Sequence, residues 1–297
     1  MSGTESVPDL EPLAERYDGF LLDQFGVLHD GRALFPGVAA ALGRLKAAGK
    51  RVVILSNSGK RAAVNEARLA KLGLARDNYD ALVSSGEVAW QGFREGREAP
   101  FSNLGRACLF FSRGGDRSAV EGLDLELVEH LAGADFVFLS GLDPDPESAE
   151  RCRALLSEAR RRDLPLLCSN PDLTAIEGEG LAPAPGRFAR DYAEAGGKVH
   201  WIGKPAPLIY RAALQRLGLP PARVLAIGDS LDHDVAGAAG VGLDSALVTG
   251  GVHRTDFGET ADPAARLRRL GEVMAARPGA AVPAWLLPGF YFEGGAA

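Results

Sequence analysis

The sequence is poor in cysteine and aromatic residues, and it has no long apolar run. The three cysteines, Cys108, Cys152 and Cys168, lie far apart without Cys-x-x-Cys or Cys/His spacing, which argues against a zinc site and a disulfide framework. No segment approaches the about 18 apolar residues of a membrane-spanning helix. Residues 1–19 are polar and acidic, unlike a signal peptide. We therefore expect a cytoplasmic protein that does not span a membrane.

The chain also lacks an excess of positive charge. Its 33 Lys and Arg residues are outnumbered by 39 Asp and Glu, which gives a formal net charge of −6. This balance argues against a nucleic-acid partner bound by a broad basic surface. With 297 residues, of which 46% are hydrophobic and 7% aromatic, the chain is long enough to bury a large core and to form two domains.

Short β-rich runs alternate with helical patterns along most of the chain. The first such series is strand 20–28, helix 37–48, strand 51–57, helix 59–73, strand 81–87 and helix 86–95. Alternation of this kind is typical of βαβ units and a parallel sheet. The runs RVVIL and RVLAIG are almost entirely apolar, as in central strands that helices cover on both faces. The predicted fold class is α/β, with a doubly wound, Rossmann-like parallel sheet.

A second alternating region interrupts this series. It comprises strands 107–111, 135–141 and 165–172, helices 123–132 and 146–162, and a further helix that ends near residue 195. We interpret it as a smaller α/β domain inserted at residues 86–198, so that residues 1–85 and 199–297 form the first domain. The apolar tail at 282–292 is expected to pack either on the core or on a partner subunit.

Polar residues follow three apolar strands of the first domain, and they are Asp23, then Ser56 and Asn57, then Asp229, Asp232 and Asp234. In an open parallel sheet the carboxyl ends of the strands line one crevice, where ligands bind at the topological switch point. These residues could therefore converge on one site. Each also has a simpler interpretation, because Asp23 could cap a turn while Ser56 and Asp229 could cap helices.

Four motifs, in their order and spacing, resemble the haloacid dehalogenase (HAD) superfamily of Asp-nucleophile hydrolases. They are Asp23 in LLDQFGVLHDG, Ser56 in VILSNSGKR, Lys204 in WIGKP and Asp229 in IGDSLDHD. The insertion between the second and third motifs, together with SNPD at 169–172, resembles subclass IIA, the p-nitrophenyl phosphatase-like enzymes with a C2-type α/β cap. The resemblance covers about residues 15–290 and implies a HAD core with an inserted cap.

This resemblance implies a Mg²⁺-dependent phosphatase that acts on a small phosphate monoester, such as a sugar phosphate or nucleotide. Asp23 would attack phosphorus and form an aspartyl-phosphate, which water then hydrolyses. Magnesium prefers oxygen ligands. By resemblance, its ligands would be Asp23, the backbone carbonyl of Phe25, Asp229 and Asp234, with Asp232 a weaker candidate.

The resemblance also implies substrate contacts. Lys204 would neutralise charge on the nucleophile and phosphate, while Ser56 and the Asn57 backbone would hold phosphate oxygens. In the cap, Asn170 and Asp172 would face the leaving group, although an Asn-Pro turn that ends a strand explains the same residues. A cap suggests a small phosphorylated metabolite as the substrate. The apolar tail and an exposed cap suggest a homodimer.

Phe25 departs from the pattern of the family. Its phosphatases usually carry a second Asp at this position, as general acid and base, and such assistance is typically worth about 10²–10⁴-fold. With Phe25 in its place, we expect slow turnover, a leaving group that needs little protonation, or a substitute acid. The candidates for a substitute are His29, Asp30 and His233.

Two alternative functions remain open. An aromatic residue at this position is also found in 2-haloacid dehalogenases, which need no metal. Their anionic substrates would be repelled by the acidic motif at 229–234 unless a cation sat among its carboxylates, so the motif favours a phosphatase. The other alternative is a non-catalytic protein that binds a phosphorylated metabolite. The sequence does not identify the substrate.

Overall fold

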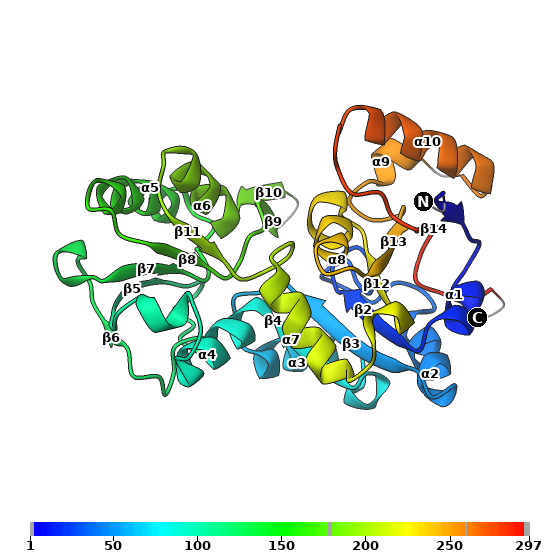
Figure 1. Ribbon diagram of the computed structural model, residues 1–297, viewed down its shortest axis with the longest axis horizontal. Coiled ribbons are helices and arrows are strands. Elements are labelled where there is room, and N and C mark those ends of the chain that lie inside the picture. Colours follow the sequence, from blue (N-terminus) through cyan, green and yellow to red (C-terminus); the bar gives the residue numbers. More distant parts are fainter. Residues whose placement is uncertain (1–2, 178–179, 259, 294–297) are drawn as a thin grey trace. The chain divides into compact units, whose positions relative to one another are not determined.

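A computed structural model describes residues 3–177, 180–258 and 260–293 of the chain (Figure 1). The chain forms two compact units. The first unit comprises Met1–Ser56, Glu66–Val83 and Lys204–Ala297, and the second comprises Asn57–Asn65 and Ser84–Gly203. Among the described residues, no helix combines the length and the apolar character needed to cross a membrane.

The first unit contains a seven-stranded sheet. In spatial order its strands are β1 (Glu5–Ser6), β14 (Trp285–Leu287), β13 (Asp244–Val248), β12 (Val224–Gly228), β2 (Gly19–Asp23), β3 (Arg51–Ser56) and β4 (Ala81–Ser84). The pairings from β1 through β3 are all parallel. The predicted α/β fold class with a doubly wound parallel sheet is therefore confirmed.

Helices and short helical turns connect these strands. The helices are α1 (Glu11–Arg16), α2 (Val38–Ala47), α3 (Ala62–Lys71), α7 (Pro207–Leu217), α8 (Ala236–Ala239), α9 (Arg254–Phe257) and α10 (Pro263–Ala275). The turns are 3₁₀ at Arg76–Asn78 and Pro221–Arg223, and π-helical at Leu231–Val235. In α2 the buried residues recur at helical spacing, as Val38, Ala41, Leu42 and Leu45. This apolar stripe explains why α2 packs against β3.

The order of the strands places a topological switch point between β2 and β12. From β2 the chain proceeds through β3 and β4 in one direction, whereas from β12 it proceeds through β13 and β14 in the other. Leu22 of β2 pairs with Ile227 of β12. Asp23 and Asp229 therefore leave two adjacent strands at the same edge of the sheet, which is where α/β folds bind ligands.

The second unit has its own parallel sheet. In spatial order its strands are β11 (Val199–Trp201), β8 (Leu166–Cys168), β7 (Phe136–Leu139), β5 (Ala107–Phe111) and β6 (Glu126–Leu127). An antiparallel hairpin of β9 (Thr174–Glu177) and β10 (Gly180–Pro183) accompanies it. The helices are α4 (Ser85–Glu95), α5 (Pro146–Arg161) and α6 (Pro185–Glu194), with 3₁₀ turns at Phe101–Asn103 and Leu131–Gly133. Helices α5 and α6 bury Cys152, Leu156 and Phe188 in the same core cluster as strand residues Val137 and Leu166.

The predicted helix at 123–132 is wrong. This segment instead forms strand β6, whose Leu127 pairs with Cys108 of β5, followed by a 3₁₀ turn at Leu131–Gly133. Val128 and Leu131 pack into the core of the second unit. A helix of about ten residues is marginal by itself, so pairing at the sheet edge and burial of these side chains outweigh its helical propensity.

The apolar tail packs on its own chain. Strand β14 pairs with both β13 and β1, and the tail buries Trp285, Leu286, Phe290 and Phe292. Of the two arrangements expected for this segment, the core arrangement is therefore the one observed. The tail gives no further reason to expect a homodimer.

Candidate active site

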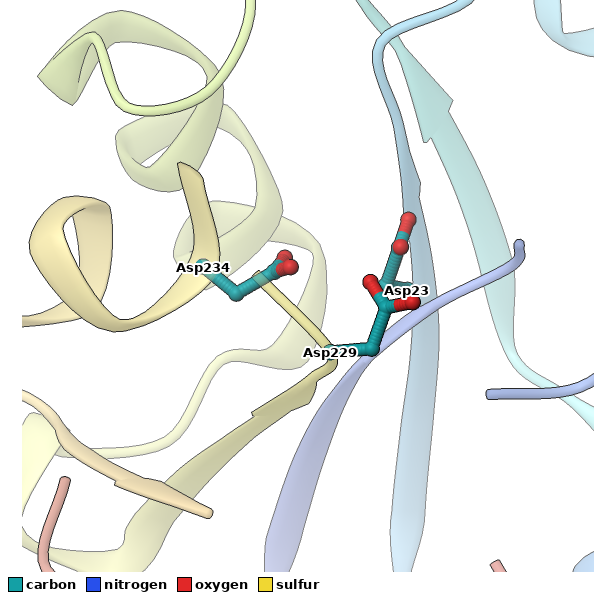
Figure 2. A group of neighbouring side chains, drawn as sticks. All are labelled: Asp23, Asp229 and Asp234. Atoms are coloured by element: carbon teal, nitrogen blue, oxygen red, sulfur yellow. The ribbon is translucent and has the colours of Figure 1, made fainter. Parts of the chain in front are cut away.

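Three predicted carboxylates meet at the switch point of the first sheet. Asp23 ends β2, Asp229 follows β12, and Asp234 lies in the π-helical turn at Leu231–Val235. Each offers one carboxylate oxygen, and these three oxygens all lie within 4.8 Å of one another. Figure 2 shows the side chains approaching from separate segments. The strand order explains this convergence, because β2 and β12 are neighbours.

A buried amine completes the cluster. The Nζ atom of Lys204 lies 2.6 Å from Oδ1 of Asp23 and 2.8 Å from Oδ1 of Asp234. With every group ionised, three negative charges face one positive charge, which leaves a net charge of −2. The Lys204 ammonium is opposed by burial but stabilised by Asp23 and Asp234, which together hold its pKa well above its ordinary value.

The negative charge and the burial of the site raise carboxyl pKa values. Burial raises the pKa of Asp23 from 3.8 to about 8; Lys204 counteracts this shift, while Asp234 and Asp229 add to it. Burial, with the like charge of Asp234, raises the pKa of Asp229 to about 6. The donor atoms of this cluster are all oxygens, and the cluster carries an excess of negative charge. Both features fit a hard divalent cation, which would neutralise the excess charge.

Backbone groups fix the direction of Asp229. Its Oδ2 atom accepts a hydrogen bond of 2.8 Å from the N–H of Val252. The loop after Asp23 also passes very close, because a Cβ atom on Gly26 would stand 1.8 Å from Oδ2 of Asp229. Gly26 has φ of +75°, which other residues rarely adopt. The sequence did not point to Val252, because its contribution is a main-chain N–H.

The turn that carries Asp234 is held from two sides. Oδ2 of Asp234 accepts from the N–H of Ser230 at 3.1 Å. The buried hydroxyl of Tyr210 donates to the carbonyl oxygens of His233 and Asp234, at 3.2 and 3.1 Å. Tyr210 was not among the predicted residues, since on the sequence it is one apolar-face position of a helix.

The contacts of Asp229, Asp232 and Asp23 distinguish members of the cluster from residues with another role. The side chain of Ser230, not Asp229, caps the following turn by accepting from the N–H of His233. Asp232 is exposed and forms a double hydrogen bond with Arg277, at 2.7 and 2.8 Å, so it is not a member of the cluster. Asp23, whose simpler interpretation was a turn cap, forms an ion pair with Lys204.

The remaining predicted site residues are distributed over both units. Ser56 is buried at the end of β3 in the first unit, next to β2. In the second unit, the Nδ2 group of Asn57 donates to Oδ1 of Asp172 at 2.8 Å. Oδ1 of Asn170 accepts from the N–H of Asp172 at 3.1 Å, as in an Asx turn. The Asn-Pro turn interpretation of this loop is therefore satisfied, and Asp172 also positions Asn57.

Phe25 and its neighbours show what surrounds the position of the missing acid. The Phe25 ring is 36% exposed, and its centroid lies 4.9 Å from that of His29. Nδ1 of His29 accepts from the N–H of Gly31, and burial lowers the pKa of this imidazole to about 4. The Asp30 carboxylate accepts from two backbone N–H groups, which lower its pKa. Neither is suited to donate a proton at neutral pH, which leaves the half-buried His233.

Comparison with known proteins places the chain in a family. Residues 20–126 match the family model described as haloacid dehalogenase-like hydrolase, and residues 201–273 match the one described as HAD-hydrolase-like. Chronophin of Bos taurus is 31% identical over 264 residues, which cover 82% of this chain and 84% of chronophin. The chain belongs to the haloacid dehalogenase-like hydrolases. The family resemblance predicted from the four motifs is thereby confirmed.

Solved structures agree with this assignment. A haloacid dehalogenase-like hydrolase from Brucella suis 1330 has 32% identity and a TM-score of 0.78, over 95% of this chain and 98% of that one. A glycerol phosphate phosphatase from Mycobacterium tuberculosis in complex with magnesium has 25% identity and a TM-score of 0.64, over 84% of this chain and 74% of that one. A glycerol-3-phosphate phosphatase of Gallus gallus is 29% identical, over 79% of this chain and 80% of that protein. With these named relatives, this HAD hydrolase is an enzyme of the phosphatase type, as the sequence predicted.

Proposed function

We propose that this HAD hydrolase is a Mg²⁺-dependent phosphatase of small phosphate monoesters, with an aspartyl-phosphate intermediate on Asp23. The observation that carries this proposal is the cluster of one half-buried and two buried carboxylates beside the amine of Lys204, in which one oxygen of each carboxylate lies within 4.8 Å of the others. The related glycerol phosphate phosphatase, solved with magnesium, supports the choice of metal.

Each residue of the cluster has a proposed role. Asp23, Asp229 and Asp234 would hold Mg²⁺ with the backbone carbonyl of Phe25, and the bound ion would neutralise the negative charge of cluster and phosphate. The Asp23 carboxylate attacks phosphorus and becomes the acyl group of the intermediate. Lys204 lies against the carboxylates of Asp23 and Asp234 and orients them through its two short contacts.

The second unit is proposed to be the cap, with residues 86–198 inserted between 1–85 and 199–297 of the core. Ser56 and the Asn57 backbone would hold phosphate oxygens, while Asn170 and Asp172 would lie toward the leaving group. The bond from Asn57 to Asp172 supports a shared function of these two residues. Sugar phosphates and nucleotides remain the expected substrates. A cytoplasmic location and a homodimer remain predictions.

Phosphate release from an aryl phosphate tests the proposal. We expect release with Mg²⁺, loss of release with a chelator, and loss in the D23N variant. D232N is the matched control, because Asp232 belongs to the same motif but is exposed and paired with Arg277. Metal-independent halide release from 2-chloropropionate would instead identify a dehalogenase. Absence of turnover across a panel of phosphorylated metabolites would identify a binding protein.

A further inference from the structure

We infer that His253 is a positioning residue of the candidate metal site. Its bond to Asp256 holds the loop that follows β13, residues 249–253, so that the N–H group of Val252 meets the carboxylate of Asp229. The inference rests on the proposed function, in which Asp229 is a ligand of Mg²⁺. It adds a residue that none of the sequence motifs contains.

The 249–253 loop lies directly against Asp229. The N–H of Val252 donates to Oδ2 of Asp229 at 2.8 Å. One residue earlier, a Cβ atom on Gly251 would stand 2.3 Å from both Cβ and Oδ2 of Asp229. A side chain at position 251 would therefore displace the carboxylate. The place of this loop thus determines the direction in which the Asp229 carboxylate points.

The first end of the loop is bonded to the central sheet. The N–H of Thr249 donates to the carbonyl oxygen of Leu287 at 2.9 Å, and its hydroxyl donates to the same oxygen at 3.4 Å. Leu287 ends β14, which pairs with β13 (Figure 1). A Cβ atom on Gly250 would stand 2.8 Å from the carbonyl oxygen of Pro288. The sheet therefore fixes residues 249 and 250, and the rest of the loop needs a second point of attachment.

His253 supplies that second attachment. Its side chain is 7% exposed, and its Nδ1 atom lies 2.8 Å from Oδ2 of Asp256. Because a carboxylate can only accept, the Nδ1–H group donates in this bond. The carbonyl oxygen of His253 also accepts from the N–H groups of Asp256 and Phe257, at 2.9 and 3.1 Å. The Nε2 atom is buried and has no hydrogen-bond partner among the described residues, so the imidazole acts through its bond to Asp256.

The helix that holds His253 is itself anchored in the core. Phe257, the last residue of α9, is 1% exposed and belongs to the same core cluster as Leu231 and Val235. These two residues come from the π-helical turn that carries Asp234. The loop that orients Asp229 and the turn that carries Asp234 are thereby attached to one core.

The test removes the bond between His253 and Asp256 in the full chain. Loss of a residue that supports a metal ligand typically costs about 10–100-fold in affinity. For H253L we expect the dissociation constant of Mg²⁺, from calorimetric titration, to rise about tenfold, the low end of this range, because Asp256 is partly exposed. Hydrogen exchange of the Val252 amide, followed by NMR in chelator, should become faster. H253N keeps an N–H donor near the position of Nδ1 and should restore both properties.

Y17F is the matched control, because it also removes a buried hydrogen bond next to β13. The hydroxyl of Tyr17 donates to Oδ2 of Asp244 at 2.6 Å, and Asp244 begins β13, at the end of the strand opposite to the loop. This variant should lower the urea midpoint of unfolding but leave Mg²⁺ affinity and exchange at Val252 as in the native chain.

Native Mg²⁺ affinity and native exchange at Val252 in H253L would overturn the inference, as would a loss that H253N does not restore. If H253L does not fold, D256A removes the same bond from its partly exposed side, and the same outcomes apply to it. The exchange measurement needs no metal. A native chain that binds no Mg²⁺ would therefore remove the proposed function, while exchange at Val252 would still decide whether His253 positions Asp229.

Discussion

The affinity of the acidic cluster for Mg²⁺ should fall as the pH is lowered. Its three carboxylates and one ammonium carry a net charge of −2 when ionised, and they are held together within a few ångströms. Burial raises the pKa of Asp23 to about 8 and that of Asp229 to about 6. Between these two values, the cluster without a cation holds one proton, chiefly on Asp23.

The size of the effect follows from the protons that a cation must displace. Between pH 8 and pH 6 one proton is released, so the dissociation constant rises about tenfold per pH unit, about 100-fold or 2.7 kcal/mol in all. Below pH 6 a second proton, on Asp229, makes the slope about 100-fold per unit. Above pH 8 both carboxyl groups are ionised, and the affinity becomes independent of pH.

Calorimetric titration of the chelator-treated chain with Mg²⁺ measures both quantities. At pH 7, in two buffers of different ionisation enthalpy, the difference in heat should correspond to about one proton released per ion bound. D232N should behave as the native chain does, since Asp232 is exposed and pairs with Arg277. An affinity that stays constant between pH 6 and pH 8, with no proton release, would refute the charge assignment.

Two substitutions probe how the cluster is held. K204M removes the amine that lies between the carboxylates of Asp23 and Asp234. Removing one partner of a buried ion pair typically costs about 3–5 kcal/mol, so the urea concentration at the midpoint of unfolding, measured in the presence of chelator, should drop. An unchanged midpoint would contradict this expectation. G26A would place a methyl group 1.8 Å from Oδ2 of Asp229 and should weaken Mg²⁺ binding in calorimetry. G73A, at a glycine with φ of +94° and open space around it, carries backbone strain alone and should bind Mg²⁺ normally. Equal binding by both variants would exclude a steric effect.

The convergence of Asp23 and Asp229 could be predicted from the sequence because it follows from the alternation of strands and helices along the chain. Alternating strands and helices imply a parallel sheet, and a parallel sheet aligns the carboxyl ends of its strands at one edge. The observed pairing of Leu22 with Ile227 provides the register that brings the two residues together. Side chains at strand ends are therefore the part of a site that the alternation of strands and helices in the sequence predicts best.

Other parts of the site leave no such signal. The N–H of Val252 that bonds Asp229 is a main-chain group, which any residue supplies. The bond between Asn57 and Asp172 joins two loops whose separate turn signals say nothing of each other. The strand at Glu126–Leu127 was predicted to be helical. Its strand conformation depends on pairing with β5, about 20 residues earlier in the chain, and the local sequence carries no sign of that pairing. In each case the group that determines the local structure or contact lies far away in the sequence.

The pairing of β2 with β12 also has a consequence for how the chain matures during synthesis. Leu22 and Ile227 must come together before the central sheet can close, and contacts so distant in sequence are slow to form. Most of the second unit, Ser84–Gly203, is translated before β12 exists. A nascent chain that still lacks its last third therefore carries Asp23 without Asp229 or Asp234, and the three-carboxylate cluster can form only after residue 234 has been translated.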